Sequence, residues 1–201
     1  MAAAAQALRD SGHRVDVLDL YAEHWEPVLG REEFPRTEGH FKPQAEQMRA
    51  VADGMLDATV RGYLDRLLAA DVLVLSFPMW WFSVPAILKG WLDRVFVMGA
   101  VFGGDEHGIF DDAALAGRRA MLLITTGGSG EAFRSGGAFG AMDDFLFHIR
   151  RGMLEFVGYR VLDPVITYGP AHMNDQERAE ALDAVTESVA RLSADTQSTV
   201  H

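Results

Sequence analysis

The sequence predicts an α/β fold in which a doubly wound parallel sheet carries helices on both faces. Apolar segments of strand length alternate along the chain with longer segments in which apolar residues recur at helical spacing. One segment, Val72 to Phe77, is apolar at nearly every position, which is typical of a parallel strand buried on both faces. Alternation of this kind joins parallel strands by right-handed helical crossovers, so helices cover both faces of the sheet.

The amino-terminal part of the chain has one predicted strand between two predicted helices. Residues 1–11 indicate the end of a helix, because an alanine-rich run closes at Gly12. Arg14 to Leu20 is predicted as a strand from its alternating apolar residues. Tyr21 to Pro43 is polar and rich in charge, which predicts a long connection, and Glu46 to Leu68 has helical periodicity over several turns.

The helix after the Val72–Phe77 strand has a recognisable start. Ser83 is the expected N-cap, and Pro85 lies in the first turn, where a missing N–H group is tolerated. The apolar residues that follow, among them Trp91 and Phe96, recur at helical spacing. We expect these two aromatic residues to belong to the core.

The carboxyl-terminal half continues the alternation. It predicts a strand at Ala120–Thr125, a helix at Phe145–Val157 that ends at Gly158, a strand at Val161–Thr167 and a helix at Asp175–Leu192. Pro164 interrupts the second of these strands, which indicates an edge strand or a bulge. Residues 192–201 are predicted as a frayed tail. Without a linker or an internal repeat, we expect residues 1–201 to form a single domain.

Composition argues against several classes of function. The formal net charge of -11 disfavours a nucleic-acid or anionic-membrane partner, and the absence of cysteine excludes disulfides and thiolate metal sites. The most apolar window contains Lys89, Asp93 and Arg94, so no membrane insertion is expected. The seven histidines are scattered, so no metal site is expected either. The predicted location is cytoplasmic.

Two loops that leave the carboxyl ends of predicted strands carry the candidate chemistry. The first contains two indoles and a phenyl ring and consists of Pro78, Met79, Trp80, Trp81 and Phe82. Three successive large rings cannot all point inward from a tight turn, so at least one should face a ligand, a partner or solvent. Open α/β sheets bind ligands at this edge.

The second loop is rich in glycine and consists of Thr125, Thr126, Gly127, Gly128, Ser129 and Gly130. Its glycines allow backbone N–H groups to approach a planar or anionic ligand closely. By itself a glycine-rich turn is a weak signal. Paired with an aromatic loop on the same rim, it indicates a site for a flat heteroaromatic ligand, which takes ring contacts on one side and hydrogen bonds along its edge.

These residues carry a resemblance to a known family. The run FPMWWFSVPAILKGWLDRVF, followed by ITTGGSG and GYRVLDPVITYG, resembles the NAD(P)H:quinone oxidoreductase family of flavodoxin-like flavoproteins. The resemblance implies a flavodoxin-like fold, an FAD cofactor with FMN as the alternative, NAD(P)H as co-substrate and a quinone as acceptor. It also implies a homodimer with two active sites at the subunit interface and a hydride relay through the flavin.

The resemblance assigns roles residue by residue. Pro78, Met79, Trp80, Trp81 and Phe82 would support the isoalloxazine ring, while Thr125, Thr126, Gly127 and Gly128 would line its pyrimidine side. Arg178 matches a position that reaches the dinucleotide end of the cofactor. The substrate pocket would be formed by Trp81, Phe102, Phe133 and Phe139. The resemblance leaves open the choice between NADH and NADPH and the natural acceptor.

Two departures from the family pattern stand out. Four of the five strands of a flavodoxin-like sheet can be identified, and the missing one is the central first strand with its phosphate-binding turn. We expect the true start of the open reading frame to lie upstream of Met1. The alternative is a rewired sheet in which Arg14–Leu20 lies next to Val72–Phe77.

The second departure concerns proton exchange. Phe133 and Phe139 occupy positions where animal members have a tyrosine and a histidine, and Arg134 is a candidate substitute cation. We expect slower but not abolished quinone reduction. Two other readings stay open: a non-catalytic or regulatory subunit, such as the ancillary proteins of membrane potassium-efflux systems, and a flavin-free relic that only dimerises.

Overall fold

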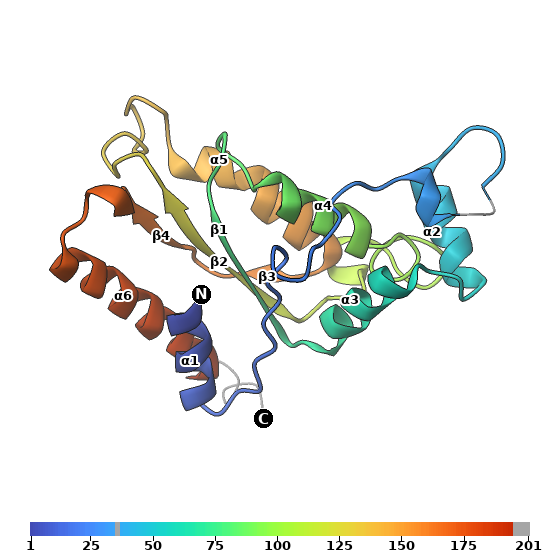
Figure 1. The fold of residues 1–201 in the computed structure, drawn as a ribbon, viewed down its shortest axis with the longest axis horizontal. Coiled ribbons are helices and arrows are strands. Elements are labelled where there is room, and N and C mark those ends of the chain that lie inside the picture. Colours follow the sequence, from blue (N-terminus) through green and yellow to red (C-terminus); the bar gives the residue numbers. More distant parts are fainter. Residues whose placement is uncertain (35–36, 195–201) are drawn as a thin grey trace.

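Strand β2 (Arg119–Thr126) lies at the centre of a four-stranded parallel sheet. The computed structural model describes residues 1–34 and 37–194. β2 pairs with β1 (Val72–Pro78) on one side and with the short strands β3 (Arg160–Val161) and β4 (Val165–Tyr168) on the other. The α/β prediction is therefore confirmed, and the flavodoxin-like arrangement of a parallel sheet between helices is visible in Figure 1.

The two faces of the sheet are covered by different helices (Figure 1). On one face, α3 (Ala58–Ala69), α4 (Ala86–Val95) and α5 (Met142–Ile149) enclose the larger core cluster. On the other face, α1 (Ala2–Asp10) packs on α6 (Asp175–Ala194). Helix α2 (Pro43–Ala52) lies to the side of these layers.

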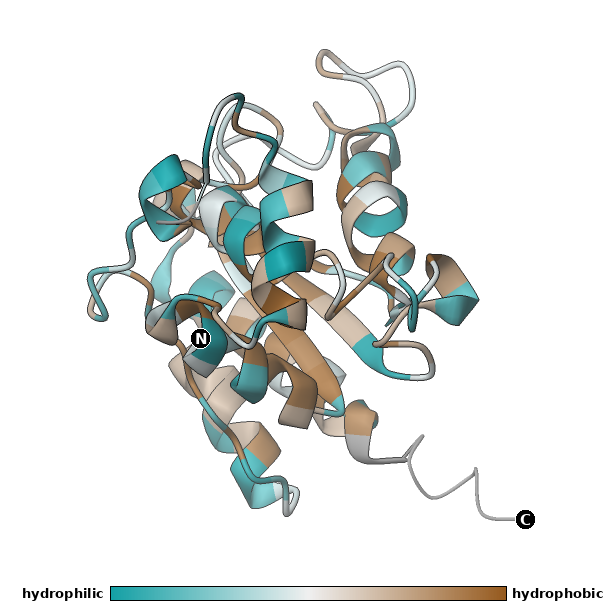
Figure 2. Cartoon of the chain, turned by 90° about the vertical axis from the view of Figure 1, so that its right-hand side faces the viewer, coloured by the Kyte–Doolittle hydropathy of each residue, from teal (hydrophilic) through white to brown (hydrophobic). Residues whose placement is uncertain are grey.

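The side chains of β2 are apolar on both faces of the sheet, so helices must cover both faces. Leu122 and Ile124 point into the larger core, whereas Met121 and Leu123 point into the smaller one, and all four side chains are buried. Each buried side chain of this size stabilises the fold by about 1.5–3 kcal/mol. Figure 2 shows the same pattern as brown apolar residues along the central strands, with teal residues on the outer turns of the helices.

The predicted strand at Arg14–Leu20 is wrong. This segment has no strand conformation and pairs with no strand in the described part of the chain, so the alternative that places it beside β1 is wrong as well. Side chains hold it instead: Arg66 of α3 binds Asp16 through two hydrogen bonds of 2.8 Å. The Arg66 guanidinium keeps the pKa of Asp16 below its ordinary value.

The predicted helix at Glu46–Leu68 is two helices. Helix α2 ends at Ala52, and Gly54 adopts a left-handed conformation with φ of 66°. The Asp57 carboxylate then accepts hydrogen bonds from the N–H groups of Thr59 and Val60, which caps α3. Apolar periodicity continued across the break because both helices face the same core, and an N-cap signal at Asp57 was present in the sequence.

Ser83 is not the N-cap of α4. The helix begins at Ala86 with Pro85, extended with ψ of 151°, in the N-cap position, and there is no side-chain capping bond because proline has no side-chain oxygen to accept one. Trp91 and Phe96 are buried, as predicted.

The later elements keep their predicted order with shifted bounds. Helix α5 begins at Met142 and continues as a π-helix (η3, Arg150–Leu154) and a 3-10 turn (η4, Glu155–Val157), which ends at Gly158 with φ of 104°. The strand interrupted by Pro164 splits into β3 and β4. Helix α6 runs to Ala194, and Leu192 is buried, so the predicted fraying is wrong at its start. Residues 195–201 of that predicted tail lie outside the described residues.

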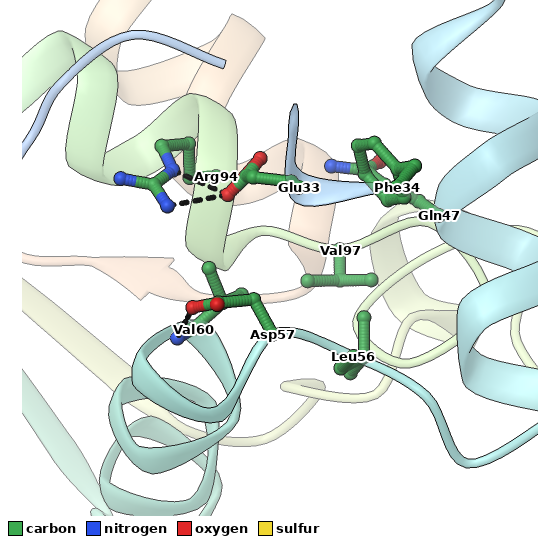
Figure 3. A pocket seen from close by; sticks show the side chains of 8 residues that line it. All are labelled: Glu33, Phe34, Gln47, Leu56, Asp57, Val60, Arg94 and Val97. Atoms are coloured by element: carbon green, nitrogen blue, oxygen red, sulfur yellow. Dashed lines mark hydrogen bonds and ion pairs between the residues drawn. The ribbon is translucent and has the colours of Figure 1, made fainter. Parts of the chain in front are cut away.

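The Tyr21–Pro43 connection is largely irregular, as predicted, and lies against α4. Its 3-10 turn η1 (Arg31–Glu33) places Glu33 against Arg94, as Figure 3 shows. Pro27 approaches Gly90 so closely that a Cβ atom there would lie 2.1 Å from the Pro27 carbonyl oxygen. Two further 3-10 turns, η2 (Phe110–Asp112) and η5 (Pro170–His172), complete the structure. Over the described residues, the helices are too short or too polar to traverse a bilayer.

Candidate functional site

The two predicted loops lie side by side at the carboxyl edge of the sheet. The ladder between β1 and β2 runs in register from Val72 opposite Arg119 to Pro78 opposite Thr125, so both strands end at the same level. The Met79 N–H then donates a hydrogen bond of 2.7 Å to the Thr125 carbonyl oxygen, which joins the aromatic loop to the glycine-rich loop. The rim inferred from the sequence therefore exists in the folded chain.

The aromatic loop closes in a tight left-handed turn. Trp80 and Ser83 exchange two backbone hydrogen bonds of 3.0 Å each, and the residues between them have positive φ, 50° at Trp81 and 59° at Phe82. This is the geometry of a type I′ turn, which usually takes asparagine and glycine. Bulky residues in this conformation are strained by about 1–2 kcal/mol each. Strain of this kind is common at ligand sites.

The two indoles of the turn face outward. The side chain of Trp81 is 95% exposed and that of Trp80 is 54% exposed, whereas Met79 is buried. The expectation that at least one ring of this loop points away from the core is confirmed. An indole so exposed is an apolar surface that a flat ligand or a partner chain can cover.

Phe82 points back into a cluster of aromatic rings. Its ring stacks on Phe145 of α5 at 4.6 Å between centroids and contacts Phe139 at 5.6 Å and Phe133 at 6.0 Å. Phe133 is buried, whereas Phe139 is 45% exposed. Of these two members of the predicted pocket, Phe139 therefore presents part of its ring to the outside, while Phe133 lies buried behind it in the aromatic cluster.

The glycine-rich loop meets this cluster from β2. A Cβ atom on Gly128 would lie 2.7 Å from the Phe133 ring and 3.0 Å from the Phe139 ring, so a glycine is needed there. A Cβ atom on Gly127 would meet nothing within 4 Å, so the backbone at Gly127 faces open space. Thr125 is exposed and Thr126 is buried.

Backbone donors remain unused along the rim. Within the described residues, the N–H groups of Trp81, Phe82, Gly127 and Gly128 form no hydrogen bond to the protein. These donors come from both loops. They suit a ligand that offers acceptors along one edge and a flat apolar face.

Tyr168, at the end of β4, extends the rim and was missed in the sequence. It pairs with Thr126 in the ladder, its ring lies 6.0 Å from that of Phe133, and a Cβ atom on Gly130 would be 3.6 Å from it. Burial raises the pKa of the Tyr168 hydroxyl. Its position in the last strand of the sheet, just before Gly169, was the available signal.

One predicted site residue, Phe102, lies away from this rim within the same chain, and another, Arg178, lies on the helix that follows β4. Phe102 follows the end of α4, and its ring contacts Phe156 at 5.3 Å, close to the start of β3 and thus toward the amino edge of the sheet. Arg178 lies in the first turn of α6, where its side chain is half exposed and paired with Asp175 at 3.2 Å.

An open groove lies between residues 40–47, α4 and the segment that begins at His148 of α5. It has a volume of about 1000 Å³, and its lining includes Lys42, Phe96, Phe102, His148 and Phe156. The groove thus connects His148, beside the aromatic turn, with Phe102 at the other end of the helices.

A second, much smaller cavity lies beneath the Tyr21–Pro43 connection. It measures about 10 Å³ and is lined by Glu33, Gln47, Asp57, Arg94 and neighbouring apolar side chains (Figure 3). This volume suits a single water molecule and no organic ligand. Over the described ranges, no three potential metal-ligating side chains come together.

Comparisons with known proteins show which fold family the chain resembles. A family model described as the flavodoxin-like fold matches residues 1–189. NAD(P)H dehydrogenase (quinone) 1 of Rattus norvegicus is 35% identical over 184 residues, which cover 90% of this chain and 66% of the rat protein. The chain therefore spans about two thirds of the length of that relative.

A bacterial relative and a solved structure extend the likeness. FMN-dependent NADH:quinone oxidoreductase 1 of Pseudomonas putida is 35% identical over 127 residues, 63% of this chain and 58% of that protein. The crystal structure of a candidate quinone reductase from Klebsiella pneumoniae superposes with a TM-score of 0.90 at 35% identity, covering 95% of this chain and 77% of that one.

Proposed function

Because the chain belongs to the flavodoxin-like family, and within it to the quinone reductases, we propose that it is a flavin-dependent NAD(P)H:quinone oxidoreductase. The observation that carries the proposal is the pairing of an outward aromatic turn with a glycine-rich loop at one rim, joined by the Met79–Thr125 hydrogen bond. A quinone and an isoalloxazine are both flat rings with oxygen acceptors on their edges, which this combination of surfaces suits.

The rim fits a flavin on two independent observations. The open space over Gly127 admits a ring system close to the backbone, and the unused N–H donors of Gly127 and Gly128 match the acceptors of a pyrimidine edge. When bound, the flavin supplies two-electron redox chemistry that amino-acid side chains lack. Met79, Trp80 and Phe82 would support the ring from the aromatic loop, and Arg178 would reach the dinucleotide end of an FAD.

The protein's own contribution is binding, orientation and charge stabilisation. Backbone donors fixed by the sheet stabilise negative charge on a bound acceptor without reorganising, because β1 and β2 hold them in place before the ligand arrives. Thr125, exposed beside Gly127, adds a hydroxyl to this edge. Trp81 and Phe139 present apolar surface against which a quinone or a nicotinamide can stack.

A homodimer with two sites at its interface is part of the proposal. Trp81 and Phe147 are 95% and 66% exposed, which is much apolar surface for one rim to leave in water. Phe102 lies beyond the carboxyl end of α4, at the opposite end of that helix from the rim, so it would close the site of a partner. The groove along α4 and α5 connects the two regions and would receive the second subunit. The proposed location is the cytoplasm, where NAD(P)H is available as the reductant.

Purification and redox assay test the proposal. The protein is expected to be yellow or to take up added flavin, to release FAD rather than FMN on heating, and to oxidise NADH or NADPH only when a soluble quinone is present. Trp81→Ala should raise the quinone KM at least fivefold, because the indole is the apolar surface on which the quinone stacks, and it should leave the melting temperature unchanged, because the indole is almost fully exposed. Colourless protein that takes up neither flavin would overturn the proposal.

The oligomeric state is measured separately by sedimentation. Phe102→Ala and Phe147→Ala should weaken dimerisation, and Phe102→Ala should also raise the quinone KM. A monomer with full activity would contradict the shared site and leave the redox assignment intact.

A further inference from the structure

The side chains of Ser83 and His148 are joined by a hydrogen bond that ties the aromatic turn to helix α5. The Ser83 Oγ atom lies 3.0 Å from Nε2 of His148, although 65 residues separate the two in sequence. Ser83 is half-buried and His148 is exposed. The hydroxyl is available for this bond because it does not cap α4, which begins three residues later at Ala86.

The turn needs support from outside itself. Two successive non-glycine residues, Trp81 and Phe82, have left-handed backbone conformations, and the indole of Trp81 is too exposed to anchor anything. Within the turn, only the two backbone bonds between Trp80 and Ser83 oppose the strain. A strained conformation persists only where its surroundings enforce it.

Helix α5 supplies that support at the carboxyl side of the strained pair. Phe145 stacks on Phe82 at 4.6 Å, and His148, three residues further along the same helix, binds Ser83. Residues three apart lie on one face of a helix, so a single face of α5 contacts both Phe82 and Ser83 of the turn. The helix changes to π geometry at Arg150, directly after this contact.

We propose that the Ser83–His148 pair is a positioning device that holds the Trp81–Phe82 turn in its left-handed conformation and thereby shapes the flavin-binding rim. The inference rests on the proposed function for its consequence at the site. Its structural part, the control of the turn, is independent of any ligand. His148 acts through Ser83 and is therefore a positioning residue.

The test of the structural part is amide hydrogen exchange in the ligand-free protein. The N–H groups of Trp80 and Ser83 are protected by the turn, whereas the neighbouring N–H of Met79 binds Thr125 of β2 and serves as an internal control. Ser83→Ala and His148→Ala should each speed exchange at Trp80 and Ser83 about fivefold, as expected for the loss of one hydrogen bond, with no change at Met79.

Further variants separate this bond from a general loss of stability. His148→Gln, whose amide can reach Ser83, should return exchange to within about twofold of the original rate. The Ser83→Ala, His148→Ala double variant should be no faster than either single variant, because both remove the same bond. His107→Gln, in the connection after α4, is the matched histidine control and should change nothing.

The link to the site is tested by flavin titration of the same variants. The flavin dissociation constant should rise about fivefold in Ser83→Ala and His148→Ala and be restored in His148→Gln. Unchanged exchange at Trp80 and Ser83 in both alanine variants would overturn the proposal. Faster exchange with an unchanged flavin dissociation constant would overturn its connection to the rim. If the unmodified protein bound no flavin, the proposed function would fail, while the exchange data would still decide the role of the pair.

Discussion

The guanidinium of Arg94 and the carboxylate of Glu33 form a buried ion pair between α4 and the Tyr21–Pro43 connection. Arg94 Nη2 lies 2.5 Å from Glu33 Oε2, and each side chain is only 8% exposed (Figure 3). Arg94 also donates to the Glu26 carbonyl oxygen and lies over the Trp25 ring at 4.4 Å from its centroid. The Arg94 side chain thus contacts Trp25, Glu26 and Glu33 of the long connection and holds this connection against α4. Helix α4 is the helix that follows the aromatic turn of the rim.

Removing one partner of this pair should be strongly destabilising. Arg94→Met leaves a buried carboxylate without its counter-charge, so the free energy of unfolding should fall by about 3 kcal/mol, measured by urea unfolding near neutral pH. The exposed Lys89–Asp93 pair on the same helix is the control. Lys89→Ala should change stability by no more than about 0.5 kcal/mol. A loss below about 1 kcal/mol in Arg94→Met would show that the pair is dispensable.

The deficit of Arg94→Met should depend on pH. Burial raises the pKa of Glu33 above its ordinary value of 4.5, and Arg94 opposes that rise in the unmodified protein. Without Arg94 the folded-state pKa rises further, so the folded variant binds more protons than the unfolded chain above pH 4.5. The stability gap to the original protein should therefore be smallest near pH 4.5 and widen toward pH 7. If the stability difference between Arg94→Met and the original protein did not change with pH, Glu33 would not be the group responsible. The double variant Arg94→Met, Glu33→Gln lacks this carboxyl group, so its stability difference should not depend on pH in this range.

Substitution of Gly127 and of Gly128, two neighbours in the glycine-rich loop, should have different effects: one should change flavin binding and the other the stability of the fold. Gly128→Ala places a methyl group against the Phe133 and Phe139 rings, so its melting temperature should fall. Gly127→Ala meets open space and should leave the melting temperature within about 1–2 °C of the original, the range expected for a change below about 0.5 kcal/mol. It should nevertheless raise the flavin dissociation constant, because the methyl group occupies the space above the backbone. Unchanged flavin binding in Gly127→Ala would place the ligand elsewhere.

Proton-exchanging groups added to the aromatic cluster should speed quinone reduction. The Phe133→Tyr, Phe139→His double variant introduces the tyrosine and histidine that the sequence lacks at these positions. Phe139 is exposed enough to accept a histidine, whereas Phe133 is buried, so Phe133→Tyr alone should lower stability by about 1–3 kcal/mol unless the hydroxyl finds a partner. Turnover is measured by stopped flow with a soluble quinone. No change in turnover would show that the pair is irrelevant in this protein.

Much of the site was predictable because it lies where strands end. Residues that follow two adjacent parallel strands must meet at one edge, so the neighbourhood of Trp80 and Gly127 followed from the apolar runs before them. Tyr168 was missed because the predicted strand ended at Thr167, one residue before it, whereas β4 includes Tyr168. The contacts of α5 with the turn were missed because no local sequence pattern links Ser83 to His148 across 65 residues.

The sequence by itself determined the α/β class, the order of most helices and strands, and the outward exposure of the aromatic turn, because periodicity and turn chemistry are local properties. Only the tertiary structure decided three further points. Arg14–Leu20 is no strand, since a strand requires a pairing partner that its residues cannot specify alone. Phe102 lies at the far end of α4 from the rim, and Trp81 and Phe82 adopt a left-handed turn that α5 enforces. Each depends on contacts between segments distant in sequence, which propensity and spacing do not encode.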